Sequence, residues 1–340
     1  MSAEEASAQR PTDPATLHAP VMVDRVVELL SPALQEPPAT LVDATLGMGG
    51  HSVALLGACP AARLVGIDRD EQALVLARAR LQPYAGRVCT YHGRYDEITS
   101  ALTSCGAGQH ADAVLLDLGV SSLQIDDTAR GFSYSRDTSL DMRMDVSGEV
   151  TAADVVNSYS QEELTRVFRE YGEERFAGRI ARAIVRARTA APLRTSAELT
   201  EVVSSAVPAA TRRTGHPAKR IWQALRIEVN DELAILDRAL PRVVSALRPG
   251  GRMVVLSYHS LEDRRVKQLY SALARPMGPD GLPLPSPMGD PVVRILTRGA
   301  EQPDHAEITR NPRAGSARLR AVEKLSSAAS PRDATRGEAA

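Results

Sequence analysis

The stretch Leu41-Val42-Asp43-Ala44-Thr45-Leu46-Gly47-Met48-Gly49-Gly50-His51-Ser52 decides the fold. An apolar run leads into an acidic residue, and three glycines follow within four positions. The next apolar run, residues 64–67, ends on Asp68. A strand, a glycine turn, a helix and a second strand that ends in an acid form the nucleotide-binding half of a doubly wound sheet. The stretch therefore predicts an α/β fold with a nucleotide-like cofactor at this turn.

The spacing of the glycines distinguishes between kinds of nucleotide site. A dinucleotide fingerprint needs G-x-G-x-x-G, and Ser52 stands where the third glycine should be. A Walker A loop needs Gly-Lys followed by Ser or Thr, and that sequence does not follow here. The remaining pattern, D-x-T-x-G-x-G-G, resembles the first motif of class I S-adenosylmethionine methyltransferases. Asp68 follows the turn at the spacing of an acid that binds both ribose hydroxyls.

Short apolar runs alternate with helical stretches on both sides of the turn. Strands are expected at residues 41–44, 63–67, 88–91, 113–117 and 252–257, with an edge strand at 292–297. Helices are expected at residues 20–30, 52–58, 71–81, 218–247 (with a kink at Pro241) and 261–273. This alternation predicts a Rossmann-like, doubly wound and mainly parallel sheet. Asp117 then lies at the sheet edge where such folds bind ligands.

The alternation is interrupted between Asp126 and Thr214. Helical stretches follow one another there without a convincing strand, at residues 152–157, 161–171, 175–188 and 196–206. We therefore expect one α/β domain made of residues 16–125 and 215–325, with an all-helical domain, residues 126–214, inserted in it. The ends of the chain, residues 1–15 and 326–340, are polar or low in complexity and are expected to be disordered.

The charge distribution favours a polyanionic partner. The net charge is only −1, but residues 211–268 contain twelve Lys and Arg against six Asp and Glu. A local excess of positive charge is typical of proteins that bind nucleic acid. On charge alone, a solvated surface rich in arginine fits the pattern equally well.

The cysteines and histidines indicate neither a metal site nor a disulfide framework. Cys59, Cys89 and Cys105 are an odd number and lie far apart, without a C-x-x-C pair, and no H-E-x-x-H is present. The N-terminus lacks the features of a signal peptide, and no apolar run is long enough to span a membrane. We therefore expect a soluble, cytoplasmic protein.

Further blocks of sequence point to one family. They are residues 18–22, 43–47, 115–122, 130–133, 140–145, 171–175, 216–218, 223–227 and 257–264. Together they resemble the bacterial 16S ribosomal RNA cytosine N4-methyltransferase family, from about His18 to Arg320. Two positions depart from the family pattern: Gly315 stands where an arginine is usual, and Tyr258 stands where phenylalanine is usual.

The resemblance implies a class I methyltransferase fold, S-adenosylmethionine as cofactor and a helical insertion that recognises RNA. It also implies N4-methylation of a cytidine, at position ~1402, of 16S rRNA in the small ribosomal subunit. The implied cofactor-binding residues are Gly49, Gly50, His51, Asp68, Tyr95, Asp117 and Gln124. The candidates for RNA binding are His216, Lys219, Arg220, Arg226 and His259. A homodimer is compatible with the sequence.

Several roles stay open. Asp117 could accept a proton from the cytosine amine, or it could contact only the cofactor. The basic residues could form a solvated or salt-bridged helix face, and His259 could be a core or capping histidine. A nicotinamide dehydrogenase fits the sheet but fails at the missing third glycine. A noncatalytic ribosome-assembly factor that retains the cofactor site would bind S-adenosylmethionine without transferring its methyl group.

Overall fold

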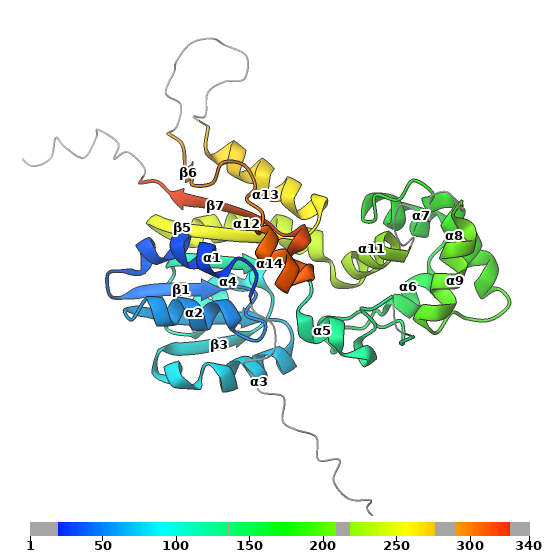
Figure 1. Cartoon of the computed structure of the whole chain (residues 1–340), viewed down its shortest axis with the longest axis horizontal. Helices are drawn as coiled ribbons and strands as arrows, with labels where there is room; N and C mark the ends of the chain where they lie inside the picture. Colours follow the sequence, from blue (N-terminus) through cyan, green and yellow to red (C-terminus); the bar gives the residue numbers. More distant parts are fainter. Residues whose placement is uncertain (1–19, 135–136, 209–217, 276–289, 327–340) are drawn as a thin grey trace, which may run out of the picture.

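The computed structural model describes residues 20–134, 137–208, 218–275 and 290–326. The described chain has two parts, an α/β part built on one sheet and a helical part beside it (Figure 1). The segments predicted to be disordered, 1–15 and 326–340, lie outside the described residues except for Ser326, and His216 lies outside them too. No helix within the described ranges is long and apolar enough to cross a membrane.

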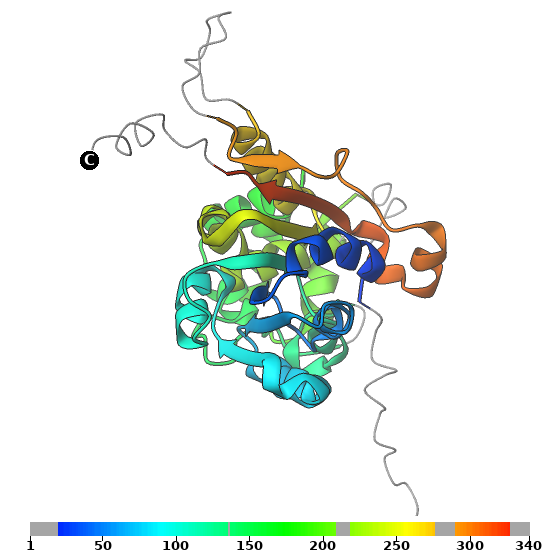
Figure 2. The same cartoon turned by 90° about the vertical axis from the view of Figure 1, so that its left-hand side faces the viewer.

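One sheet of seven strands, counted over the described residues, forms the centre of the α/β part. Its order is β3-β2-β1-β4-β5-β7-β6, and β1 to β5 run parallel. The strands are β1 (Ala39–Asp43), β2 (Ala62–Asp68), β3 (Val88–His92), β4 (Ala111–Asp117), β5 (Leu247–Ser257), β6 (Val293–Ile295) and β7 (Arg318–Lys324). Figure 2 shows β6 and β7 along one edge. The Rossmann-like sheet and its edge strand are as predicted, whereas the antiparallel strand β7 was not expected.

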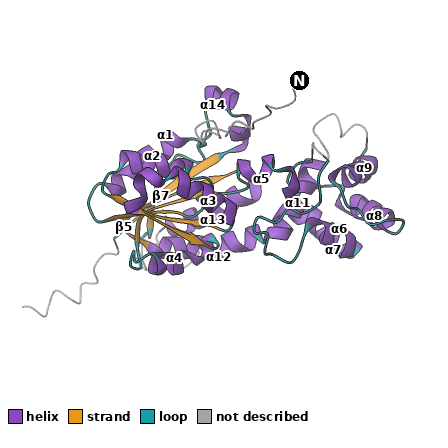
Figure 3. Cartoon of the chain, turned by 90° about the horizontal axis from the view of Figure 1, so that it is seen from below, coloured by secondary structure: helices purple, strands orange, loops and turns teal. Residues whose placement is uncertain are grey.

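Helices cover both faces of the sheet (Figure 3). Neighbouring strand residues point to opposite sides of the sheet, and the apolar residues on each side form a core with the helices there. One face packs against α1 (Val23–Leu30), α2 (Gly50–Ala58) and α3 (Glu71–Arg80). The other face packs against α4 (Ile98–Ser104), α12 (Glu232–Ala246) and α13 (Ser260–Leu273). Both faces are buried, so the central strands read as continuous apolar runs, as in residues 113–116.

The helical part has its own apolar core. Its helices are α6 (Ala152–Ser158), α7 (Gln161–Glu170), α8 (Ala177–Arg188), α9 (Ser196–Ala206) and α11 (Ala218–Asn230). The helices α6, α7 and α9 begin at a Ser or Thr whose side chain accepts the backbone N–H three residues later, which stabilises the first turn. Helix α11 packs Ile221 and Leu225 into this core and leads directly into α12, so it joins the two parts. Two short helices, α5 (Ser122–Asp126) and α14 (His305–Arg310), lie near the junction of the two parts (Figure 1).

The predicted single helix over residues 218–247 is wrong. The chain breaks at Asp231, whose φ of 52° is left-handed, and α12 continues through Pro241. Asn230, the last residue of α11, has a buried amide that is bonded both to its own helix and to another segment. It donates to the carbonyl oxygens of Met142 and Arg226 and accepts the N–H of Met144, at 2.7–2.9 Å. These bonds anchor the end of α11 to residues 142–144, and the chain must turn there.

The prediction of no disulfide is also wrong. Cys89, in β3, is bonded to Cys105, the residue that follows α4, with 5.8 Å between the two Cα atoms. Cys59 is free and buried. An odd number of widely spaced cysteines shows no pairing in sequence, because only the sheet packing brings the start of β3 and the end of α4 together.

Candidate functional site

A cavity of about 710 Å³ opens at the carboxyl ends of the parallel strands. Its wall includes Asp68 and Asp117, which end β2 and β4, and Tyr258, which follows β5. Residues of the helical part, among them Trp222 and Gln223, line the opposite side. The cavity therefore lies where the two parts meet, at the edge at which open α/β sheets bind ligands.

The predicted glycine turn forms one end of this cavity. Gly47 and Gly49 have φ values of 51° and 75°, a left-handed conformation that favours glycine. Gly50 begins α2, and Gly50 and His51 line the cavity. Gly49 does not line it. A side chain on Gly49 would come within 3.2 Å of Leu81, so this glycine allows α2 to pack closely against the end of α3.

Ser52 has a structural role at the position where a dinucleotide fingerprint carries glycine. Its hydroxyl donates a 2.6 Å hydrogen bond to the buried carboxylate of Asp43 at the end of β1. Burial raises the pKa of Asp43, and the bond from Ser52 opposes this rise. The serine thus ties the first turn of α2 to the strand that precedes the glycine turn.

Asp68 closes the turn from the side of the second strand. Its Oδ2 accepts the N–H of Gly47 at 2.7 Å, and its Oδ1 accepts the N–H of Asp70 at 2.8 Å. Burial raises the pKa of Asp68 to about 6. Each carboxylate oxygen has a second lone pair, so the half-buried side chain can still accept hydrogen bonds from a ligand in the cavity.

Asp117 is held by groups from three elements. The hydroxyl of Tyr258 donates to Oδ1 at 2.7 Å, Nδ1 of His51 lies 3.6 Å from Oδ2, and the backbone N–H donates to the hydroxyl of Thr45 at 2.6 Å. Burial raises the pKa of Asp117, and His51 and Tyr258 lower it. Nε2 of His51 lies 2.8 Å from the carbonyl oxygen of Val21, so this imidazole joins the turn before α1 to the floor of the site.

Tyr95 and Gln124 line the cavity, but their polar atoms contact the protein. The hydroxyl of Tyr95 donates to the carbonyl oxygen of Glu232 at 3.3 Å. The amide of Gln124 donates to Asp70 at 3.0 Å and accepts the N–H of Ser121 at 3.1 Å. Gln124 therefore fixes α5 to the loop after β2, two residues from Asp68.

The predicted RNA-binding residues separate into two groups. Lys219, Arg226 and His259 line the cavity, whereas Arg220 points elsewhere and donates to the carbonyl oxygen of Glu173 at 3.2 Å. The guanidinium of Arg226 is paired through two nitrogens with the carboxylate of Glu232, at 2.8 and 2.9 Å. Arg226 is therefore held inside the wall of the cavity.

Several aromatic and acidic residues of the cavity wall were not predicted from the sequence. Phe132, Tyr134 and Trp222 line the helical side, and Glu232 and Glu262 lie on the side of α12 and α13. Aromatic residues make up only 4% of the chain, and Phe132 lies in the family block 130–133, which was the one available signal for the aromatic wall. Glu262 lies in the family block 257–264, whereas Glu232 lies in none, and the break at Asp231 decides where Glu232 points.

Comparison with known proteins identifies the family to which this chain belongs. A profile of the MraW methylase family matches residues 15–325. The chain belongs to the MraW methylase family. This methylase is 57% identical over 323 residues to ribosomal RNA small subunit methyltransferase H of Thermobifida fusca, covering 95% of this chain and 98% of the relative. It is 54% identical to the enzyme of the same name from Mycolicibacterium smegmatis, over 92% of this chain and 85% of that one.

Among solved structures, an rRNA methylase from Streptococcus thermophilus aligns with this methylase at a TM-score of 0.41 and 13% identity. The alignment covers 94% of this chain and 100% of the other.

The cavity fits S-adenosylmethionine, the cofactor of this methylase. Asp68 would supply carboxylate oxygens for the ribose hydroxyls, and the N-terminus of α2 would supply the N–H groups of Gly50 and His51 for the methionine carboxylate. Tyr95 and Leu236 would provide apolar surface for the adenine. When it is bound, the cofactor supplies an electrophilic methyl group on a positively charged sulfur.

Proposed function

We propose that this methylase methylates the exocyclic N4 amine of a cytidine in 16S rRNA of the small ribosomal subunit, at position ~1402. The observation that carries the proposal is that one cavity combines an aromatic wall with a half-buried carboxylate, Asp117, opposite it. The names of the curated relatives support ribosomal RNA of the small subunit as the substrate.

The aromatic wall supports a nucleobase as the substrate. Tyr134 and Trp222 are packed edge to face, with 6.2 Å between ring centroids, and Phe132 lies in the same wall. Enzymes that modify a base extrude it from its stack and hold it against aromatic side chains. Among the described residues, the buried indole N–H of Trp222 has no hydrogen-bond partner.

Asp117 supports transfer to an amine. The lone pair of the cytosine amine is delocalised into the ring, so the amine must be held in line with the methyl group and must lose a proton during transfer. A half-buried carboxylate whose pKa is raised is suited to accept that proton. Tyr258 and His51 hold this carboxylate in one orientation.

Positive charge near the mouth of the cavity supports a polyanionic substrate. Lys219 is exposed and lines the cavity, at the start of α11. We propose that residues 126–214 and the start of α11 hold the RNA over the cofactor, with the phosphates close to Lys219. We also propose that the chain forms a homodimer, and sedimentation of the purified protein tests that part.

The decisive experiment uses small subunits isolated from cells that lack this modification. They are incubated with the purified methylase and isotopically labelled S-adenosylmethionine, and the nucleosides are analysed by mass spectrometry. We expect N4-methylcytidine at one site, and no labelling of subunits that already carry the modification. A label on carbon 5 would contradict the N4 assignment. Cofactor binding without any transfer would favour a noncatalytic assembly factor.

A further inference from the structure

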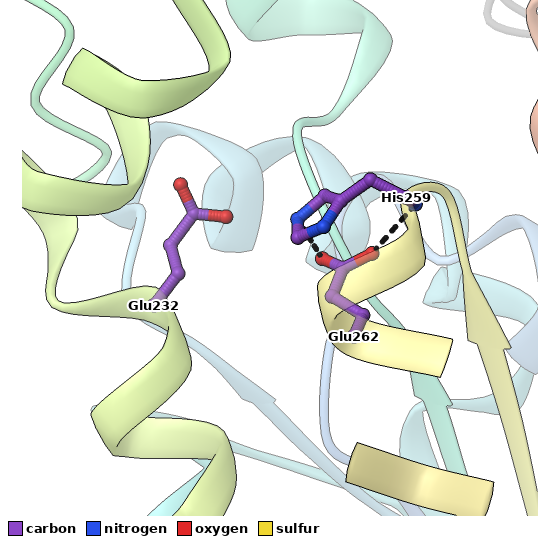
Figure 4. A group of neighbouring side chains, drawn as sticks. All are labelled: Glu232, His259 and Glu262. Carbon is purple, nitrogen blue, oxygen red and sulfur yellow. Dashed lines mark hydrogen bonds and ion pairs between the residues drawn. The ribbon is translucent and has the colours of Figure 1, made fainter. Parts of the chain in front are cut away.

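We propose that Glu232, His259 and Glu262 form a binding site for a divalent metal ion of the Mn²⁺ or Zn²⁺ type in the wall of the cavity. One potential ligand atom from each residue lies within 4.8 Å of the other two. Figure 4 shows the three side chains converging, with Glu232 coming from α12 and the other two from the start of α13. The proposal does not depend on the RNA substrate.

The imidazole of His259 is the first reason. Its side chain is only 8% exposed, and neither ring nitrogen has a hydrogen-bond partner within the described parts of the chain. Nε2 lies 3.2 Å from Oε1 of Glu262, but this contact lacks hydrogen-bond geometry. A buried polar group without a partner destabilises the fold, and a bound metal ion would satisfy one of these nitrogens.

The carboxylate of Glu262 is held in place by the backbone. Its Oε2 accepts the N–H groups of Tyr258 and His259, at 2.8 and 3.2 Å. These bonds orient Oε1 toward the imidazole (Figure 4). The side chain is 3% exposed, so this carboxylate is removed from water at the foot of the site. A carboxylate fixed in this way resembles the oriented ligands of protein metal sites.

The carboxylate of Glu232 completes the group from the opposite side. Both of its oxygens contact Arg226, and each retains a second lone pair for another partner. With a neutral imidazole, the carboxylates of Glu232 and Glu262 and the guanidinium of Arg226 carry a total charge of −1. A bound divalent cation would change this total to +1. Arg226 repels a cation, so we expect a weaker site than a purely anionic one.

The donor set decides which metal fits. One imidazole nitrogen with two carboxylate oxygens suits Zn²⁺ or Mn²⁺ better than Mg²⁺, which prefers oxygen ligands alone. The ligand atoms around a four-coordinate zinc stand roughly 3.4 Å apart, so the His259–Glu262 pair already has the required spacing. Three protein ligands leave a coordination position for an oxygen of water or of a bound nucleotide, because all three residues line the cavity.

The test measures Mn²⁺ binding to the full-length protein after treatment with a chelator, without any nucleotide. Titration calorimetry should show one ion per chain. Glu232→Gln, His259→Asn and Glu262→Gln should each weaken binding by about tenfold or more. Asp237→Asn is the matched control, since Asp237 is an exposed carboxylate on the same helix as Glu232 and should leave binding unchanged.

A spectroscopic readout keeps the proposal testable if one of these variants fails to fold. Bound Mn²⁺ in the unmodified protein should show magnetic coupling to an imidazole nitrogen by pulsed electron paramagnetic resonance, and His259→Asn should abolish it. Absence of stoichiometric binding at millimolar Mn²⁺ would overturn the proposal. So would binding that shows no nitrogen coupling, or that survives the substitutions at Glu232 and Glu262 together.

Discussion

The hydroxyl of Tyr258 donates a 2.7 Å hydrogen bond to Oδ1 of Asp117 and thereby joins the ends of β5 and β4 across the site. This bond stabilises the ionised carboxylate and lowers a pKa that burial raises. The family pattern expected from the sequence carries phenylalanine at this position, so this bond would be a departure from that pattern.

Replacing Tyr258 by phenylalanine tests this bond. Loss of the donor raises the pKa of Asp117 further, so the rise of the methylation rate with pH should shift to higher pH. The ring is retained, so the packing beneath Gly119 is preserved. Rates measured as a function of pH at saturating cofactor give the shift. An unchanged profile would mean that the protonation of Asp117 does not limit the rate.

Replacing Asp117 by asparagine distinguishes between the two roles of this residue. If Asp117 accepts the amine proton, the rate at saturating S-adenosylmethionine should fall by about 10²- to 10⁴-fold. Calorimetric binding of S-adenosylhomocysteine to the same variant is the control for a lost cofactor contact. A near-normal rate, with weaker binding alone, would restrict Asp117 to cofactor binding.

The cofactor affinity should depend on pH through Asp68. Its carboxyl has a pKa of about 6 in the folded chain, and ionisation is needed for it to accept both ribose hydroxyls well. The affinity for S-adenosylhomocysteine should therefore rise as the pH increases through about 6. In Asp68→Asn the dependence should be lost, and binding should weaken by roughly 1.5–3 kcal/mol at pH 8. Retention of the pH dependence in that variant would assign it to another group.

The raised pKa of Asp68 should also make the free energy of unfolding of the ligand-free protein depend on pH. The unfolded carboxyl titrates near ~3.9, so the folded chain binds more protons between that pH and about 6. Protonated Asp68 therefore stabilises the folded chain fully when the pH is below the pKa of the unfolded state. This stabilisation is lost as the pH rises through the pKa of the folded state. Urea unfolding of Asp68→Asn against the unmodified chain, from pH 4 to 8, should show this difference.

The ion pair between Arg130 and Asp70 should matter more for folding than pairs at the surface. Both side chains are buried, with Nη2 2.9 Å from Oδ2, and Arg130 also donates to the carbonyl oxygens of Arg143 and Met144. Arg130→Met leaves a buried carboxylate without its cation and should lower the free energy of unfolding by about 3–5 kcal/mol. Arg264→Met breaks an exposed pair with Glu173 and should cost at most about 1 kcal/mol. Equal losses in urea unfolding would contradict this assignment.

Local sequence determined the α/β part of the fold and the positions of its acidic residues. A parallel strand buried on both faces is a short apolar run, and the chain must leave it at the ligand edge. Asp68 and Asp117 could therefore be placed on that edge directly from the runs that precede them. Glycine residues at 47 and 49 likewise mark left-handed backbone that other residues adopt with difficulty.

Only the tertiary structure decided which groups meet across the cavity. Tyr258 and Asp117 are 141 positions apart, and Asn230 bends the chain so that Glu232 turns back toward Arg226. Cys89 and Cys105 pair because β3 and α4 pack together, and β7 joins the sheet antiparallel to β5. Such contacts depend on hydrogen bonds and packing between distant segments, which a local pattern of residues does not encode. The glycine turn could be recognised from its own residues, whereas the group of Glu232, His259 and Glu262 exists only in the folded chain.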